Sequence, residues 1–329
     1  MRIAIDAHGG DHAPAEVIEA VKRAARAWPE YEFVVVGQVD KMSAPDYENI
    51  QFHHTTEKIE PDDEPVRSVR RKKDASMVVG CAQVKNKTFD AFISGGNTGA
   101  LMAAGLFYTG RLPGVDRPAL AAIFPSVVGQ GTLVLDVGAN PEAKPEHLRQ
   151  YALMGSIYAT HVLGIEKPRV GLLNIGTEAG KGTSLTKEAF RMMHTEAAIH
   201  FVGNVEARDI LTGVCDVLIC DGFSGNVLLK NTEGVAKEIF SRLKQEFMRT
   251  PLTKLAALAL KPGLQSFKGD MDYKEHGGAP LLGLAGPIIK AHGSSDARAF
   301  FNAIRQAIQF HEKGVIDLIT THLASEGAD

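Results

Sequence analysis

Cysteine and tryptophan are scarce in this chain of 329 residues, which has three cysteines and one tryptophan. Cys81, Cys215 and Cys220 lack the C-x-x-C spacing of a zinc site or a redox pair, so we expect buried, reduced thiols. No H-E-x-x-H or similar spacing links the histidines, although His8, His276 and His292 all fall in glycine-flanked turns that could converge. We therefore expect neither a metal nor another cofactor.

Long apolar runs and excess charge of one sign are also lacking. No stretch reaches the roughly 18 apolar residues that suggest a membrane span, and the first ten residues, MRIAIDAHGG, are too weakly apolar for a signal peptide. The formal net charge is -3, and the only dense basic block, residues 70–73, reads as a solvated helix face. We expect a cytoplasmic protein that does not bind nucleic acid.

Short segments rich in β-branched residues alternate with longer helical patterns along the whole chain. Ten segments predict strands: 2–7, 31–37, 49–54, 90–95, 119–124, 132–138, 169–176, 199–204, 216–222 and 287–293. Seven patterns predict helices: 15–27, 66–85, 100–108, 145–163, 184–196, 226–248 and 295–313. This alternation predicts an α/β fold with a largely parallel sheet sandwiched by helices.

One pair of segments departs from that pattern. Residues 119–124 and 132–138 are joined by PSVVGQG and predict an antiparallel hairpin, so the sheet is expected to be mixed. No Ser/Gly-rich linker divides the chain. We expect a single catalytic unit over residues 1–329, with two lobes around a cleft and a lobe boundary that the sequence leaves open.

Six predicted strands end in turns rich in glycine and polar residues. Singly, each turn could serve only to bend the chain or to cap a helix. In an open parallel sheet, however, ligands bind beyond the carboxyl ends of the strands, so we expect all six to line one cleft at one edge. The six turns cover residues 6–11, 94–99, 136–140, 177–184, 204–206 and 221–226.

The turn SGGNTG has the composition of an anion site. Its glycines allow backbone N–H groups to come close to an anion, its polar side chains can donate hydrogen bonds, and a helix start follows. The residues in question are Ser94, Gly95, Gly96, Asn97, Thr98 and Gly99. The turn predicts binding of an anion without specifying which one.

Known nucleotide fingerprints do not fit these turns. SGGNTG lacks the G-x-G-x-x-G order, and GTEAGKGT is one residue short of a P-loop, with Gly182 where a Ser or Thr would meet magnesium. A nicotinamide-dependent dehydrogenase is therefore disfavoured. Lys181, between Gly180 and Gly182, could neutralise a bound phosphate, and its alternative role is a solvated surface charge.

Taken together, the turn motifs resemble those of a known family. The motifs MRIAIDAHGGDHAP, FISGGNTGALMAAG, LDVGAN, LNIGTEAGKG, FVGNVEARDI, CDGFSGNVLLK and HGGAPLLG closely resemble the bacterial phosphate acyltransferase family, over residues 1 to about 323. The resemblance implies transfer of a long-chain acyl group from acyl-[acyl-carrier-protein] to inorganic phosphate, giving acyl phosphate for phosphatidic acid synthesis. The alternatives are a phosphotransacetylase-like enzyme that uses acyl-CoA, and a non-catalytic membrane scaffold.

The resemblance also implies a structural and cellular setting. It implies a two-lobed fold related to phosphotransacetylases and isocitrate-type dehydrogenases, and a homodimer. The implied partners are acyl carrier protein, the membrane and a membrane glycerol-3-phosphate acyltransferase.

Roles for individual residues follow from this reaction. The turn 94–99 and Lys181 are expected to hold phosphate, and Asn226 or Asn140 to stabilise the oxyanion of the tetrahedral intermediate. His276 is our candidate acid for the leaving thiolate, with Lys181 as the electrostatic alternative. Because no G-x-S-x-G motif is present, direct transfer is favoured over an acyl-enzyme. The further expected substrate-binding residues are Asp136, Asn140, Asn174, Gly180, Gly182, Asn204, Asp221 and Gly225.

Residues 249–268, RTPLTKLAALALKPGLQSFK, carry four basic residues and no acidic one. Pro251 and Pro262 are expected to bracket a short amphipathic helix that contacts the inner face of the cell membrane, or alternatively forms a dimer contact or a lid. An acidic carrier protein needs a basic docking surface, and residues 70–73 and 249–268 are both candidates. The expected membrane-contact residues are Leu252, Lys254, Leu255, Leu258 and Lys261.

Overall fold

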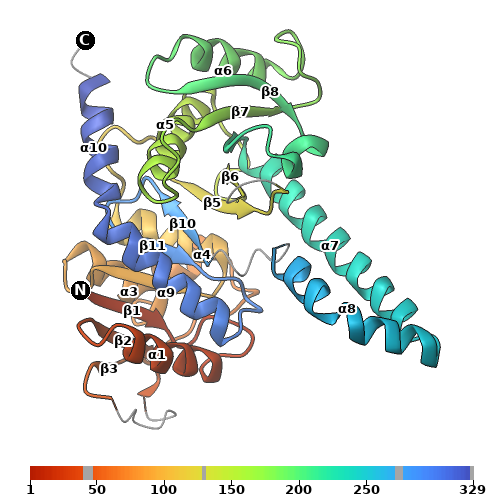
Figure 1. Cartoon of the computed structure of the whole chain (residues 1–329). Helices are drawn as coiled ribbons and strands as arrows, with labels where there is room; N and C mark the ends of the chain where they lie inside the picture. Colours follow the sequence, from red (N-terminus) through yellow and green to blue (C-terminus); the bar gives the residue numbers. More distant parts are fainter. Residues whose placement is uncertain (40–46, 128–130, 271–276, 327–329) are drawn as a thin grey trace.

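The computed structural model describes residues 1–39, 47–127, 131–270 and 277–326, with side chains omitted for 265–270 and 324–326 (Figure 1). In this part of the chain one sheet of 11 strands has the order β3-β2-β1-β4-β11-β10-β5-β6-β9-β7-β8. The strands are β1 (Arg2–Asp6), β2 (Glu32–Gly37), β3 (Ile50–His54), β4 (Ala91–Ser94), β5 (Ala119–Phe124), β6 (Thr132–Leu135), β7 (Arg169–Asn174), β8 (His200–Glu206), β9 (Val217–Ile219), β10 (Ala279–Leu282) and β11 (Ile288–Lys290).

Helices cover both faces of the sheet, which confirms the predicted α/β class (Figure 1). On β1, Ile3 and Ile5 belong to the core under α1 and α9, whereas Ala4 belongs to the core under α3 and α4. The helices are α1 (Ala15–Ala27), α2 (Pro65–Arg71), α3 (Ser76–Lys85), α4 (Thr98–Ala104) with a π-helical continuation η2 (Gly105–Thr109), α5 (Pro145–His161), α6 (Ser184–Thr195), α7 (Gly222–Phe247), α8 (Pro251–Asp270), α9 (Ala297–Glu312) and α10 (Val315–Glu326), besides the 3-10 turn η3 (Ala207–Thr212).

Strand direction reverses between the two halves of the sheet. The pairs β11/β10, β10/β5 and β5/β6 are antiparallel, whereas the other pairs are parallel. The hairpin expected from residues 119–138 is confirmed. Because three reversals separate β11 from β6, β4 and β6 run in opposite directions. The six turns therefore do not follow strands of one direction, and their convergence on one cleft stays a prediction.

Two helices leave the body of the molecule. Figure 1 shows α7 and α8 side by side as an arm that projects from the sheet. Many apolar side chains on this arm are exposed, with Leu252 the most exposed at 77%. In the described part of the chain, no helix combines the length and apolar character needed to cross a bilayer.

The structure also differs from the predicted elements in several places. The helix expected over 66–85 is broken at residues 72–75, where Ala75 is extended and bridges to Glu57, and the Asp74 carboxylate accepts hydrogen bonds from the backbone N–H and hydroxyl of Thr56. Strand β10 and helix α10 were not predicted. Helix α8 continues past Pro262 instead of ending there. The strand β10 contains Pro280, which weakens the sequence signal for a strand.

Candidate active site

A row of buried polar side chains crosses the first half of the sheet. Asp6 ends β1, Ser94 ends β4 and Lys290 ends β11, and these strands are neighbours. The Asp6 carboxylate accepts hydrogen bonds from the hydroxyls of Ser94 and of Ser76 on α3, both at 2.6 Å. Asp6 and Ser94 are almost completely buried, at 2% and 0% exposed. Burial of a carboxylate requires such partners, so the pair fixes the start of the SGGNTG turn.

Glycines let the turn after β1 pack directly on the turn after β4. A Cβ atom at Gly9 would lie 2.6 Å from the Gly96 nitrogen, and one at Gly95 would lie 2.8 Å from the Gly9 oxygen. Neither position can carry a side chain without moving backbone. Close packing of the two turns is therefore enough to explain why glycine stands at these positions. Anion binding at this turn stays a prediction.

Asn97 is the N-cap of α4. Its side-chain oxygen accepts a hydrogen bond from Ala100 N at 3.0 Å, and its amide nitrogen donates to Pro61 O at 2.8 Å. This cap explains why α4 begins at Thr98. The side chain also ties the turn to residues 61–65, and Gly99 lies against Pro65.

Lys290 was missed by sequence reasoning, which treated it as one residue of an apolar strand. Its ammonium donates to the Ala291 carbonyl, and the side chain is only 8% exposed. Burial lowers the pKa of Lys290 to about 8, helped by the charge of Lys230 on α7 and opposed by Asp6 and Asp11. A buried lysine with a lowered pKa is a common feature of functional sites, and Lys230 places α7 near this edge.

The second half of the sheet contains a separate cluster around Asp136, which directly follows β6 and is fully buried. Its carboxylate accepts five hydrogen bonds, and burial is the main reason why its pKa is raised. The donors are the backbone nitrogens of Leu120, Gly138, Ala139 and Asn140 and the side-chain amide of Asn140. The carboxylate therefore shapes the loop 136–140.

Helix α7 begins against that loop. Gly222 N donates to Asn140 O at 2.9 Å, and the Asp221 carboxylate caps the helix by accepting from Ser224 N and its hydroxyl. Asn226 lies beside Gly138, with its side-chain oxygen 3.6 Å from a Cβ atom built there. Five of the predicted site residues, Asp136, Asn140, Asp221, Gly225 and Asn226, thus come together.

A third group lies at the ends of β7 and β8. The Asn174 amide donates to Lys181 O at 3.2 Å, and the Asn204 amide donates to Glu178 O at 2.9 Å. Gly182 has a φ of +93°, and a Cβ there would lie 2.3 Å from the Asn174 side-chain oxygen. The two asparagines therefore hold the glycine loop in shape, while Lys181 itself is exposed.

Three other predictions concern histidine, cysteine and metal. His276 lies outside the described residues. Cys215 and Cys220 are buried, which raises the pKa of Cys215 to about 12 and that of Cys220 well above its usual value. Such thiols are poor nucleophiles. No cluster of potential metal-ligating side chains occurs among the residues for which the structure gives a placement.

Comparison with known proteins shows which family this chain is similar to. Residues 1–318 match the family model described as fatty acid synthesis protein. A phosphate acyltransferase from Bacillus cytotoxicus is 54% identical over 328 residues, 99% of either chain. One from Brevibacillus brevis is 55% identical over 327 residues, 98% of this chain and 97% of that protein.

Solved structures share the fold at low sequence identity. A phosphotransacetylase from Streptococcus pyogenes superposes with a TM-score of 0.61 at 16% identity, covering 95% of this chain and 94% of that one. A branched-chain phosphotransacylase from Enterococcus faecalis gives 0.58 at 14% identity, covering 94% of this chain and 99% of the other. The expected likeness to phosphotransacetylases is confirmed, whereas the one to isocitrate-type dehydrogenases stays a prediction. On the match over residues 1–318 and the full-length relatives, the chain belongs to the fatty acid synthesis protein family and is an acyltransferase.

Proposed function

We propose that this protein transfers a long-chain acyl group from acyl-[acyl-carrier-protein] to inorganic phosphate, giving acyl phosphate for phosphatidic acid synthesis. The observation that carries the proposal is the 54% identity, over nearly the whole chain, with a relative named phosphate acyltransferase. The phosphotransacetylase-like fold supports it as a scaffold, without specifying a substrate.

The reaction needs little from the protein beyond placement of its reactants. A phosphate oxygen forms a bond to the thioester carbonyl carbon, the C–S bond breaks, and the proton of hydrogen phosphate leaves with the sulfur as a thiol. Because phosphate is already anionic, donors that hold it in line with the carbonyl matter more than a strong base. The turn 94–99 and exposed Lys181 are the proposed phosphate ligands.

The oxyanion of the tetrahedral intermediate would be stabilised on α7. Asn226 is the fifth residue of that helix and lies beside Gly138, whereas the side-chain amide of Asn140 already donates to Pro118, Asp136 and Tyr151. Of the two candidates, Asn226 is therefore the proposed oxyanion donor and Asn140 a positioning residue. His276 remains the proposed acid for the leaving thiolate: it would give its proton to the sulfur and be reprotonated by the proton that hydrogen phosphate loses.

The arm is proposed to contact the membrane as part of the same function. Leu252, Leu255 and Leu258 are 77%, 67% and 66% exposed, and Lys254 and Lys261 are exposed beside them. Apolar and basic side chains together suit an anionic lipid surface. Retained co-sedimentation of a folded Leu255→Glu, Leu258→Glu variant with anionic liposomes would end this part of the proposal. We also propose that the protein is a homodimer and that a membrane acyltransferase consumes the acyl phosphate.

The direct test is mass-spectrometric detection of acyl phosphate formed from palmitoyl-[acyl-carrier-protein] and phosphate. Product that depends on both reactants supports the proposal, and its absence with an active control relative contradicts it. Parallel reactions with palmitoyl-CoA test the alternative, a phosphotransacetylase-like enzyme that uses CoA thioesters. If only the CoA thioester reacts, the carrier-protein part is wrong while transfer to phosphate stands.

A further inference from the structure

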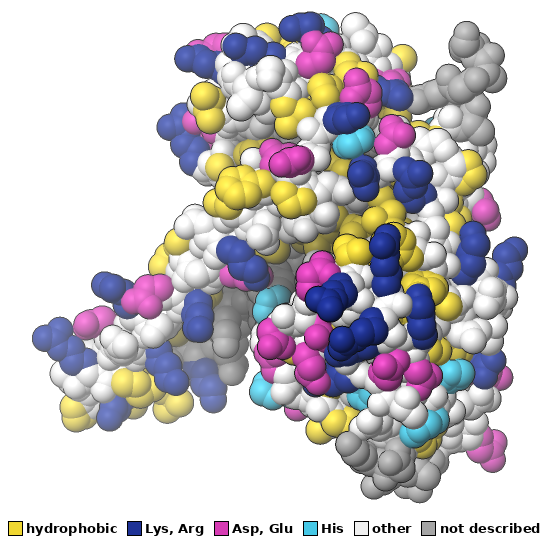
Figure 2. Space-filling model, turned by 180° about the vertical axis from the view of Figure 1, so that it is seen from behind, with side chains coloured by type: hydrophobic (Ala, Val, Ile, Leu, Met, Phe, Trp, Pro, Cys, Tyr) yellow, Lys and Arg dark blue, Asp and Glu magenta, His cyan; other side chains and the backbone are white. Residues whose placement is uncertain are grey.

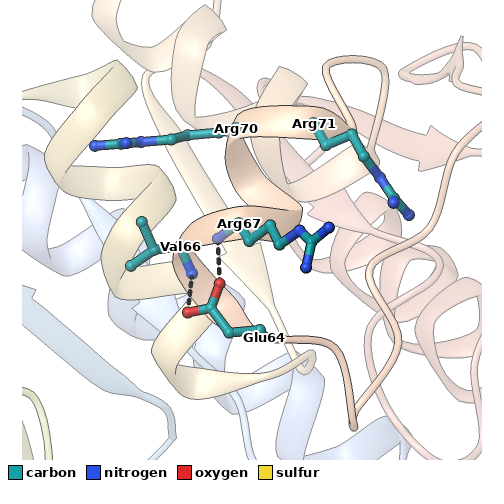
Figure 3. A pocket seen from close by; sticks show the side chains of 5 residues that line it. All are labelled: Glu64, Val66, Arg67, Arg70 and Arg71. Atoms are coloured by element: carbon teal, nitrogen blue, oxygen red, sulfur yellow. Dashed lines mark hydrogen bonds between the residues drawn. The ribbon is translucent and has the colours of Figure 1, made fainter.

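A basic surface surrounds α2. It is distinct from the three polar clusters described above. Arg67, Arg70 and Arg71 are exposed on this helix, and they line a shallow hollow of about 470 Å³ together with Glu64 and Val66 (Figure 3). Figure 3 shows Arg70 pointing to one side of the helix and the other two arginines to the opposite side. Figure 2 shows Lys and Arg side chains gathered on the lower half of the molecule as seen from behind.

These arginines are not held in ion pairs with acidic neighbours. Among the described residues, no carboxylate lies within ion-pair distance of Arg67, Arg70 or Arg71. The adjacent Glu64 carboxylate is occupied by the backbone N–H groups of Val66 and Arg67, as the dashed lines in Figure 3 mark. The charge of Arg71 contributes to the lowered pKa of the nearby Asp63 carboxyl, but that carboxylate is paired with Lys72, so the three guanidinium groups remain available to an external partner.

An aromatic side chain belongs to the same surface. Phe107 of η2 is 49% exposed, and the Arg70 guanidinium lies 5.0 Å from the centre of its ring. Exposed arginine next to exposed aromatic and aliphatic side chains is the composition of protein-binding hot spots. We call Val66, Arg67, Arg70, Arg71 and Phe107 the α2 patch.

The α2 patch adjoins the turn that is proposed to hold phosphate. Pro65, the first residue of α2, lies against Gly99, and the Asn97 amide donates to Pro61 O. A protein bound at the patch would thus hold a thioester on a flexible arm next to this turn. The arm helix α8 packs on α7, and Arg249 beside it already pairs with Glu246.

We propose that the α2 patch is the docking surface for an acidic carrier protein that delivers the acyl thioester. This inference rests on the proposed function, because the partner is its acyl donor. The sequence left two basic segments as candidate docking surfaces. Under this inference α2 binds the carrier protein, and α8 contacts the lipid surface. Charge complementarity of this kind acts mainly on encounter and specificity.

The test reverses the charge of the patch and compares two acyl donors. In an Arg67→Glu, Arg70→Glu, Arg71→Glu variant, we expect KM for palmitoyl-[acyl-carrier-protein] to rise roughly tenfold or more at low salt. Catalysis with palmitoyl-pantetheine should stay within about twofold, because this donor has the same thioester but no acidic protein. The dissociation constant of the carrier protein itself, measured by NMR titration, should rise in parallel.

A control of equal charge change uses Arg191→Glu, Arg305→Glu and Lys313→Glu. These residues are exposed on α6 and at α9, away from the described clusters. We expect this variant to keep the KM for both donors. Thermal unfolding of both variants checks that the exposed substitutions leave the fold intact.

The outcomes separate the inference from the proposed function. An unchanged KM and dissociation constant for the carrier protein overturns the inference, as does an equal loss with both donors. Loss of binding to phosphatidylglycerol vesicles with normal carrier-protein binding also overturns it, since the patch would then be a lipid surface. If the unmodified enzyme forms no acyl phosphate from either donor, the proposed function fails, and the NMR titration still decides whether the patch binds the carrier protein.

Discussion

Gly225 of α7 lies directly against the main-chain oxygen of Asp136, so closely that a Cβ atom at this glycine would be 1.9 Å from that oxygen. The second nearest contact of such a Cβ would be the Cys220 sulfur at 2.8 Å. Both neighbours belong to the sheet edge from which the loop 136–140 and α7 start. The absence of a side chain at Gly225 therefore sets how closely the two proposed site segments approach.

Replacement of Gly225 by alanine should push α7 away from the loop. The neighbour is backbone and cannot rotate aside, so we expect Gly225→Ala to lower the free energy of unfolding by about 1–3 kcal/mol or more and to lose most activity. Urea denaturation and initial rates measure this. The matched control is Gly234→Ala in the same helix, where a Cβ meets nothing within 4 Å and the substitution should stabilise by about 0.5–1 kcal/mol. Equal stability of the two variants would contradict the close-packing argument.

Asp136→Asn should be destabilising although it removes a buried charge. The two oxygens of Asp136 accept five hydrogen bonds, so an amide NH₂ in either orientation would face N–H donors. We expect a loss of about 1–3 kcal/mol for each group left without a partner. Chemical denaturation at neutral pH measures it. A loss below about 0.5 kcal/mol would mean that the carboxylate is not what holds this loop.

The sequence predicted what depends on local pattern. Alternation of apolar residues placed β1, and the alanine-rich run predicted a helix over 100–108, although α4 begins two residues earlier, at Thr98 after its cap Asn97. Features that depend on distant partners were not predictable: the break between α2 and α3 includes contacts of Asp74 with Thr56 and of Ala75 with Glu57, and β10 is a strand between β5 and β11. Lys290 gave no signal because its burial arises from neighbouring strands.

Lys290 should make stability depend on pH above neutrality. Its pKa is about 8 in the folded protein against 10.5 ordinarily, so between these values the unfolded chain binds more protons. The free energy of unfolding should therefore rise with pH across this window, by about 3 kcal/mol in the limit. Denaturation at pH 7.5 and 10 should show the gain in the parent and in the exposed control Lys237→Met, but not in Lys290→Met. A gain of equal size in all three proteins would contradict the burial of a titrating lysine.

Asn97→Asp distinguishes a ligand of phosphate from a helix cap. Aspartate keeps the oxygen that accepts from Ala100 N, so the cap survives, and we expect a stability change of no more than about 1 kcal/mol from the lost donor to Pro61. The added negative charge would repel an anion at the turn 94–99, so KM for phosphate should rise roughly tenfold or more while KM for the thioester changes little. Asn97→Ser also keeps a capping oxygen but adds no charge, and its effect on KM for phosphate should be smaller. If Asn97→Asp leaves KM for phosphate unchanged, the side chain serves the helix alone, and the anion must bind elsewhere.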